Sequence, residues 1–300
     1  MVMTDSSWLW VIFTLIAAAA QTARNAAQRE LSTTLGTAGA THVRFLFGIP
    51  FGLLFLALVL IATGLPLPRP GLVYWPWVLV GGLSQIAATA LMLTAMEGRS
   101  FVVVYAFIKT EPVLVALFGL ILLGDVVTPP MAVAILIATS GVVVMSLRPD
   151  VLEGRLKPTL LGVTAGGLFG LSAIGYRGAI LSLEVPHYVL AASFTVVIGL
   201  AIQSGVMSLY LWLKNPGTLT AIFRAWRPSL FAGFMGALAS QFWFLAFAVA
   251  TAASVRTLAL VEVLFAQAIS SFMFKQPTKP REALGIILIS AGVLLLLWAY

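Results

Sequence analysis

The sequence of 300 residues contains no cysteine and only two histidines, His42 and His187. The absence of cysteine excludes disulfide bonds, thiol catalysis and cysteine-ligated metals. Two histidines are too few for a histidine-rich metal site. The chain also lacks the Gly-x-x-x-x-Gly-Lys-Ser/Thr motif of ATP-binding loops. We therefore expect no metal, no other cofactor and no ATP hydrolysis by this chain.

Charged residues are scarce as well. They make up 9% of the chain, and 61% of the residues are hydrophobic, whereas soluble domains average about 25% charged residues. The mean hydropathy is +1.06, so most of the surface has to face lipid rather than water. The net charge of +7 comes from lysines and arginines that are scattered singly. A nucleic-acid partner would require a basic stripe, so the expected partner is the lipid bilayer.

Long apolar runs are what the sequence has in abundance. A membrane-spanning helix needs about 20 mostly apolar residues. Turn-forming residues such as Pro129-Pro130 and Asn215-Pro216-Gly217 separate the runs. The sequence predicts an all-α polytopic membrane protein with ten transmembrane helices, at 8–28, 39–62, 72–95, 101–123, 130–147, 158–180, 187–213, 228–250, 254–274 and 281–299.

A repeated spacing divides the chain into two halves. Glu111 is followed by a proline after 18 residues and by a glycine after 30, and Glu262 is followed by the same residues at the same distances. A shift of 151 residues aligns these positions without a gap. Five predicted spans precede the polar stretch 148–157 and five follow it. Because five is odd, the two copies must enter the bilayer in opposite directions. We therefore predict two inverted five-helix repeats, at 1–150 and 151–300.

The distribution of lysine and arginine predicts the orientation. Thirteen of these residues lie near one set of predicted span ends, whereas Arg69, Arg177 and Arg256 belong to the other side. The basic side faces the cytoplasm in most membrane proteins. With ten spans, this rule places both termini outside the cytoplasm of a multi-pass protein of the cell inner (plasma) membrane.

Short motifs in both halves resemble a known family. Thr110–Leu114 carries a Glu-Pro start, Leu123–Asp125 a Leu-Gly-acid helix end, and Val261–Phe265 repeats the first motif in the second half. His42–Leu46 is similar to an Arg-Phe segment that opens a second helix. Together they resemble the EamA module of the drug/metabolite transporter superfamily. The resemblance implies a ten-helix transporter, with export as the common direction. It also implies cytoplasmic termini, where the charge distribution favours external ones, and we follow the charge distribution.

Two carboxylates, Glu111 and Glu262, lie near the middle of apolar runs. A charge at that depth is costly, so it is usually buried, paired and functional. In one interpretation both residues are structural, and they hold helices together by pairing with a buried arginine or a backbone donor. The other makes them proton-coupling carboxylates. The sequence leaves both interpretations open.

Lys109 is the deepest cation in the predicted spans. On a continuous helix it would point about 200° away from Glu111, and Tyr105 would share its face. Under the shift of 151 residues, Tyr105 corresponds to Arg256 and Lys109 to Leu260. We predict that these two faces line a central, water-filled cavity that binds the substrate.

Further candidates for substrate binding are the polar and aromatic side chains that lie within the other spans. Each has a structural alternative: an arginine can extend to the headgroups, a glutamine can hold helices together, and an aromatic ring can pack in the core. Tyr176 and Arg177 lie at the end of a span and are expected to gate the outer mouth. The candidates are Arg24, Arg44, Gln21, Gln85, Gln241, Trp243, Tyr176 and Arg177.

The sign of the interior charge predicts the substrate. Interior cations outnumber the two interior carboxylates, and a wet pocket with that surplus attracts anions. We therefore predict a secondary active transporter that exports small metabolites such as amino acids or organic anions by alternating access. The alternative is a proton-coupled multidrug exporter of lipophilic cations. A passive channel is a further alternative, whereas an enzyme would need a catalytic constellation that the sequence lacks. Two modules supply both halves of a cavity, so a monomer suffices.

Overall fold

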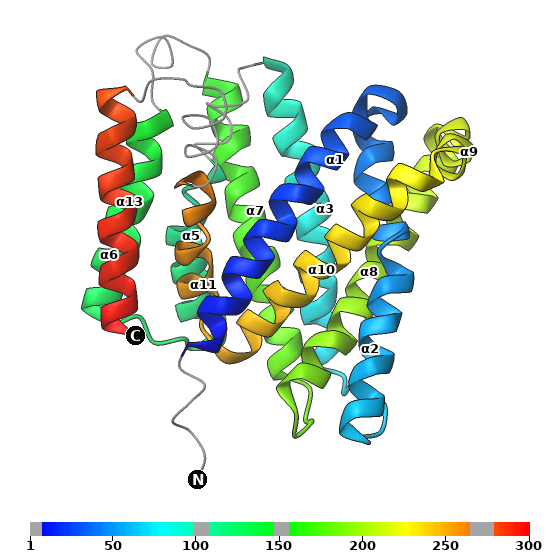
Figure 1. The fold of residues 1–300 in the computed structure, drawn as a ribbon, viewed down its shortest axis with the longest axis horizontal. Helices are drawn as coiled ribbons and strands as arrows, with labels where there is room; N and C mark the ends of the chain where they lie inside the picture. The colour runs from blue at the N-terminus through cyan, green and yellow to red at the C-terminus, as the bar shows by residue number, and fades with distance from the viewer. Residues whose placement is uncertain (1–7, 99–107, 147–155, 265–278) are drawn as a thin grey trace. The chain divides into compact units, whose positions relative to one another are not determined.

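A computed structural model describes residues 8–98, 108–146, 156–264 and 279–300 of the chain (Figure 1). The described residues form eleven α-helices and one π-helical segment, with no β-strand. Five of these helices are long and apolar enough to cross a membrane, and two shorter apolar helices cover 111–123 and 129–145. The all-helical membrane fold predicted from the sequence is therefore confirmed, while the count of ten spans stays a prediction.

The chain divides into two compact units, each built from segments of both sequence halves. Unit 1 contains residues 1–83 and 175–249, and unit 2 contains residues 84–174 and 250–300. The repeats predicted at 1–150 and 151–300 are a different division, because they concern which segments correspond rather than which segments pack together. That division stays a prediction.

Unit 1 is a bundle in which α1 packs closely on α10, and both of these helices and α2 contact α8. A buried cluster that includes Leu31, Val43, Leu211 and Ile222 joins α1, α8 and α9. The helices are α1 (Leu9–Leu46), α2 (Ile49–Thr63), α8 (Tyr188–Lys214), α9 (Pro216–Arg224) and α10 (Trp226–Val249), with the first residues of α3 (Tyr74–Gly98) and the last residues of α7 (Leu156–Leu181).

The first helix reverses direction at Gly36. This residue has φ 67° and ψ 170°, a conformation that is essentially restricted to glycine. The Gln28 side-chain amide donates to the Ala40 carbonyl oxygen at 2.9 Å, across twelve residues of sequence. Such a contact requires that the segment after Gly36 folds back along the segment before it. The predicted break between the first two spans is therefore a glycine turn within α1, and Phe47-Gly48 separates α1 from α2.

Unit 2 contains two helices that end or begin inside a predicted span. Helix α11 packs against α5 and α6, and α6 packs closely against α13. The elements are α5 (Glu111–Phe118), the π-helical segment η1 (Gly119–Leu123), α6 (Pro129–Ser146), α11 (Ala252–Leu258) and α13 (Pro280–Ala299), with the remaining parts of α3 and α7.

The packing of α6 against α13 relates equivalent positions of the two sequence halves. A Cβ atom on Gly141 would lie 2.7 Å from the Gly285 carbonyl oxygen, and one on Gly292 would lie 2.8 Å from the Ala134 carbonyl oxygen. Since Gly141 corresponds to Gly292 and Ala134 to Gly285, each contact is the counterpart of the other. The order of these contacts also shows that the two helices run antiparallel. Under the shift of 151 residues the contacts of the two helices are thus reciprocal, as a two-fold relation would require.

Replacing Gly141 tests this close approach. The Cβ of Gly141→Ala would lie 2.8 Å from two atoms of Ile289 in addition to the Gly285 oxygen, so the backbones of α6 and α13 have to separate. We expect the free energy of unfolding to fall by about 1–3 kcal/mol, measured by denaturant titration in detergent. The control is Gly205→Ala in α8, where the added Cβ would have no atom within 4 Å. Equal stability of the two variants would contradict the tight α6–α13 contact.

Candidate functional site

Four charged residues of unit 2 form two ion pairs between the two halves of the sequence. Lys109 Nζ pairs with Glu262 Oε1. Arg256 Nε lies 3.1 Å from Glu111 Oε1, and this contact is an ion pair rather than an aligned hydrogen bond. Both carboxylates are buried, and Lys109 interacts electrostatically with Glu111 and Arg256 as well. Each glutamate is thus neutralised by a cation from the other half.

Both ion pairs lie where a helix is interrupted. Lys109 and Thr110 form a turn, and α5 begins at Glu111, with Pro112 in its first turn. In the second half α11 ends at Leu258, a turn follows at 259–260, and helical backbone resumes at Val261. The sequence analysis treated 105–111 as one continuous helix, and this premise is wrong at 109–110. The turn is the reason why Lys109 and Glu111 take part in one cluster rather than pointing to opposite sides.

A second charged site lies in unit 1. Arg24 and Arg44 are both 8% exposed and interact electrostatically. The reversal of α1 at Gly36 brings them together against Gly236 of α10. There an added Cβ would lie 3.3 Å from Arg44 Cβ and 3.5 Å from Arg24 Cδ. Gly236 therefore leaves the space that the two long side chains occupy.

The positive charge of this arginine pair is not balanced within the described part of unit 1. The acidic residues described there, Glu30 and Glu184, are both exposed. Arg24 donates to the Asn25 amide oxygen from Nε at 3.3 Å and from Nη2 at 2.8 Å. Among the described residues, Nε and Nη2 of Arg44 have no hydrogen-bond partner. A buried guanidinium with unused donors is costly in a low-dielectric interior, so the pair is suited to hold an anion.

Neutral polar side chains on the helices of unit 1 pair with one another, and one of them interacts with the arginine pair. Tyr176 of α7 interacts electrostatically with Arg44, and its ring centre lies 4.4 Å from that of Phe244. The Trp243 indole donates to the Gln21 amide oxygen at 3.2 Å, and Gln241 donates to the Ser193 hydroxyl at 2.8 Å. Six of the residues that were predicted to bind the substrate therefore lie in unit 1 and have defined interactions there: Gln21, Arg24, Arg44, Tyr176, Gln241 and Trp243.

The remaining predicted residues lie elsewhere. Arg177 belongs to unit 1, where its guanidinium donates to the Phe247 carbonyl oxygen on α10. Gln85 belongs to unit 2, and its backbone carbonyl accepts a hydrogen bond from Thr89 at 2.8 Å. Tyr105 lies outside the described residues. The roles assigned to these residues in substrate binding and gating stay predictions.

Three residues that the sequence analysis did not single out take part in the unit 1 site. Asn25 accepts from Arg24, Ser193 accepts from Gln241, and Gly236 provides space for both arginines. Only Gly236 had a signal in the sequence, because it lies four residues after Ala232 and this small-residue spacing favours close helix packing. Asn25 and Ser193 are ordinary polar residues whose partners become visible only in three dimensions.

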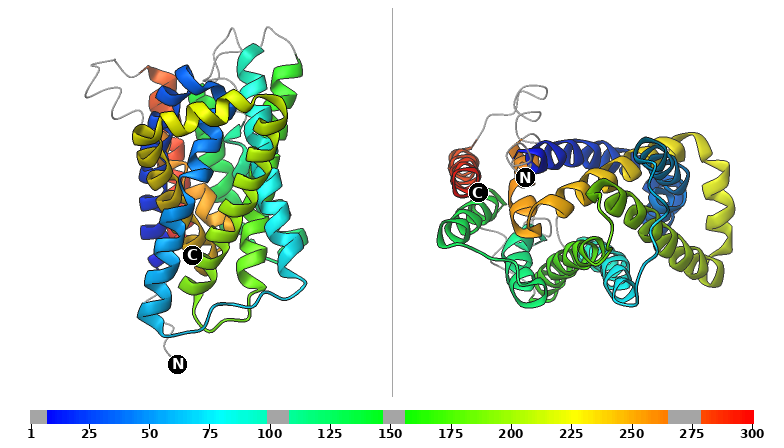
Figure 2. Two further views of the ribbon diagram at one scale, coloured as in Figure 1. Left: turned by 90° about the vertical axis from the view of Figure 1, so that its right-hand side faces the viewer. Right: turned by 90° about the horizontal axis from the view of Figure 1, so that it is seen from below.

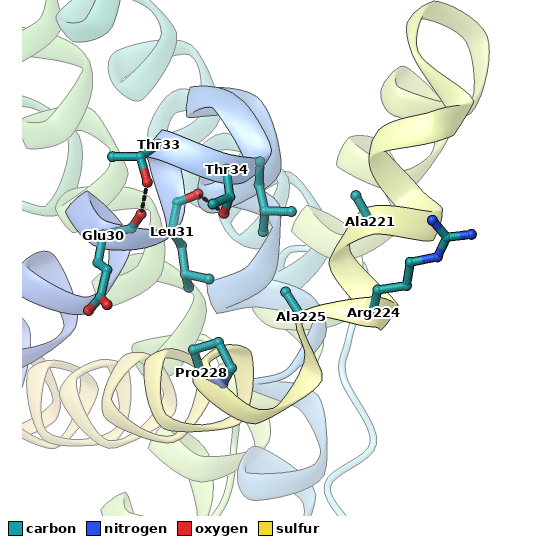
Figure 3. A pocket seen from close by; sticks show the side chains of 9 residues that line it. Glu30, Leu31, Thr33, Thr34, Ala221, Arg224, Ala225 and Pro228 are labelled. Atoms are coloured by element: carbon teal, nitrogen blue, oxygen red, sulfur yellow. Dashed lines mark hydrogen bonds between the residues drawn. The ribbon is translucent and has the colours of Figure 1, made fainter.

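An open pocket of about 530 Å³ lies in unit 1, and neither arginine of the pair lines it (Figure 3). Residues of α1, α9 and the start of α10 line it: Glu30, Leu31, Thr33, Thr34, Leu35, Ala221, Arg224, Ala225 and Pro228. The hydroxyls of Thr33 and Thr34 already donate to backbone carbonyl oxygens of α1. None of the lining residues was predicted to bind the substrate.

The long apolar helices and the buried charges define a multi-pass membrane protein. Residues 8–147 match the model of the EamA-like transporter family. The resemblance to this family of the drug/metabolite transporter superfamily that was inferred from the sequence motifs is thereby confirmed for residues 8–147. Members of this family are membrane transporters rather than enzymes.

A solved crystal structure of a protein shares the fold. It superposes with a TM-score of 0.65 at 17% sequence identity, and the alignment covers 94% of this chain and 97% of that chain. At this identity the similarity concerns the fold alone. No curated protein matches the sequence.

Proposed function

We propose that the chain is a secondary active transporter that exports small metabolites, such as amino acids or organic anions, by alternating access. It would act as a monomer in the cell inner membrane, with both termini outside the cytoplasm. The observation that carries the proposal is the pair of interrupted helices in unit 2, each with a buried glutamate and a cation from the other half at the break.

Interrupted helices at corresponding positions of two repeats are typical of secondary transporters, where they hold substrate or coupling-ion sites. A purely structural membrane bundle has no need to break two helices and to bury three charges there, because each buried charge is costly. The reciprocal, antiparallel contacts of α6 and α13 further support two inverted five-helix repeats. Inverted repeats are one of the architectures on which alternating access is built.

The arginine pair of unit 1 supports an anionic rather than a cationic substrate. In unit 2 two cations face two carboxylates, so the charges there balance. In unit 1, Arg24 and Arg44 are buried while the described carboxylates are exposed. A lipophilic cation would be repelled by this pair, whereas a carboxylate would satisfy the unused donors of Arg44 bidentately.

The second candidate function is a proton-coupled exporter of lipophilic cations. It is favoured by the burial of Glu111 and Glu262, which are the carboxylates that such a mechanism would require. Both carboxylates already have cationic partners, so a cationic drug would have to displace Lys109 or Arg256 first. The anion transporter is therefore the better supported proposal.

Ligand-induced stabilisation and transport assays separate these functions. A ligand that binds only the folded protein at 100 times its Kd stabilises it by about 2.7 kcal/mol, so a screen by thermal unfolding can find it. We expect amino acids or organic anions to raise the melting temperature and lipophilic cations not to do so. Uptake of the selected anion into proteoliposomes should depend on an ion gradient. Stabilisation by cations alone would favour the drug exporter, and uptake that continues without any gradient would favour a channel.

A further inference from the structure

An exposed surface at one end of unit 1 combines cations with large aromatic rings. We call it the α9 patch, because it consists of α9 and the helix ends on either side of it. Phe223 is 60% exposed, Trp226 50% and Trp212 64%. Arg227 extends over the Trp226 ring, with its guanidinium carbon 5.4 Å from the ring centre. The patch contains Trp212, Lys214, Phe223, Arg224, Trp226 and Arg227, all of which are exposed.

Helix α9 has the orientation and the sidedness of a helix that lies in a membrane interface. It is seen end-on in Figure 1 and lengthwise in Figure 2, where it crosses the ends of neighbouring helices of unit 1. Ile222 is fully buried in the cluster with Leu31, Leu35 and Leu211, whereas the adjacent Phe223 and Arg224 are exposed. Helices that lie in the interface plane typically combine aromatic residues with lysine and arginine in this way.

In the described part of the chain, no carboxylate forms an ion pair with the cations of the α9 patch. The sequence contains no Asp or Glu between Glu184 and Glu262. The carboxylate closest to the patch across the pocket is that of Glu30, and the side chains of Glu30 and Arg224 point away from each other (Figure 3). Three exposed cations within fourteen residues therefore face an environment that has to supply the negative charge.

The pocket beside Arg224 adds an apolar surface to these cations. Leu31, Leu35, Ala221, Ala225 and Pro228 line it, and its two threonine hydroxyls are used within α1. Cations at the rim of a largely apolar depression fit a ligand with a phosphate at one end and hydrocarbon at the other.

We infer that the α9 patch binds an anionic phospholipid. Arg224 and the neighbouring Lys214 and Arg227 bind its phosphate, and the three aromatic rings lie at the level of the headgroups. The glycerol and the first acyl carbons contact the apolar floor of the pocket. This inference does not depend on the transported solute, because the arginine pair proposed to bind that solute does not line the pocket.

The test uses the full-length protein in uncharged detergent micelles, titrated with phosphatidylglycerol or phosphatidylcholine. Native mass spectrometry gives the apparent Kd for each lipid, and thermal unfolding gives the stabilisation. Each cation near an anionic surface contributes about fivefold to binding. The variant Lys214→Gln/Arg224→Gln/Arg227→Gln is therefore expected to lose on the order of a hundredfold in phosphatidylglycerol affinity. Its affinity for phosphatidylcholine should stay the same.

The matched control is Arg69→Gln/Lys279→Gln/Arg281→Gln, which removes three other exposed cations and the same net charge. It should keep the preference for phosphatidylglycerol. The inference is overturned if both lipids bind the parent protein equally, or if the two triple variants lose the same affinity. It is also overturned if glycerol phosphate or inorganic phosphate stabilises the protein as much as the lipid does, because the site would then serve a soluble anion.

Discussion

Lys109→Met is expected to lower the free energy of unfolding by about 3–5 kcal/mol, because it leaves the Glu262 carboxylate buried without its cation. Glu262→Met should cost a similar amount by leaving the Lys109 ammonium unpaired. The double variant Lys109→Met/Glu262→Met removes both charges and should recover most of the loss, since buried ion pairs are often replaceable by apolar side chains. Denaturant titrations of all four proteins in the same detergent measure this double-mutant cycle.

The control for this cycle is an exposed cation that does not belong to the ion pair. Arg69 is exposed in unit 1, so Arg69→Met should change stability by less than about 0.5 kcal/mol. Additive losses for Lys109 and Glu262 would contradict the pairing. The ion pair between Arg256 and Glu111 provides a second cycle of the same design, and its members interact with Lys109, so the two cycles should be coupled.

The same double variant separates the two interpretations of the glutamates. If the pair only holds α5 to the second half, a stable double variant should still transport its substrate in proteoliposomes. If Glu262 takes part in proton coupling, the double variant should be stable but unable to use a pH gradient. A transport assay on a variant of restored stability thus tests the mechanism without the complication of unfolding.

Much of the helical framework was predictable from the sequence, because apolar length and turn residues act locally. The predicted span 187–213 corresponds to α8 at Tyr188–Lys214, and 281–299 corresponds to α13 at Pro280–Ala299. Asn215-Pro216-Gly217 follows the end of α8, and Pro280 begins α13. Helix α9 was missed, because the sequence Asn215-Pro216-Gly217 predicts a turn and the helix after it is short.

The interrupted helices and the ion pairs could not be predicted from local features of the sequence. Pro112 was a signal for the start of α5, but the break at 259–260 contains only alanine and leucine, which favour a continuous helix. Lys109 and Glu262 are 153 residues apart, so their contact depends on tertiary packing. One interpretation paired both glutamates with a buried arginine or a backbone donor; Glu111 pairs with the partly buried Arg256, whereas Glu262 pairs with Lys109. The arginine pair of unit 1 depends on the chain reversal at Gly36. A single glycine in the sequence is not enough to predict such a reversal.

Arg44→Met is expected to change binding and stability in opposite directions. The guanidinium of Arg44 is buried beside Arg24, and its Nε and Nη2 have no hydrogen-bond partner among the described residues. Removing it relieves the repulsion and the cost of burying the charge, so the ligand-free protein should unfold at a higher temperature. The same change removes the donors proposed for the substrate anion, and losing one partner of such a buried pair costs about 2–5 kcal/mol of binding energy.

The expected result is a more stable protein that neither binds nor transports the anion, a known trade-off at functional sites. Thermal unfolding with and without the ligand, and proteoliposome uptake, measure the two effects. Gly236→Ala is the matched variant: its Cβ would lie 3.3 Å from Arg44 Cβ, a tight contact, and 3.5 Å from Arg24 Cδ, an ordinary one. It shifts Arg44 slightly without removing charge and should weaken anion binding less than Arg44→Met does. If Arg44→Met lowered stability and left binding unchanged, Arg44 would be a structural residue, and the anion site would have to be sought elsewhere.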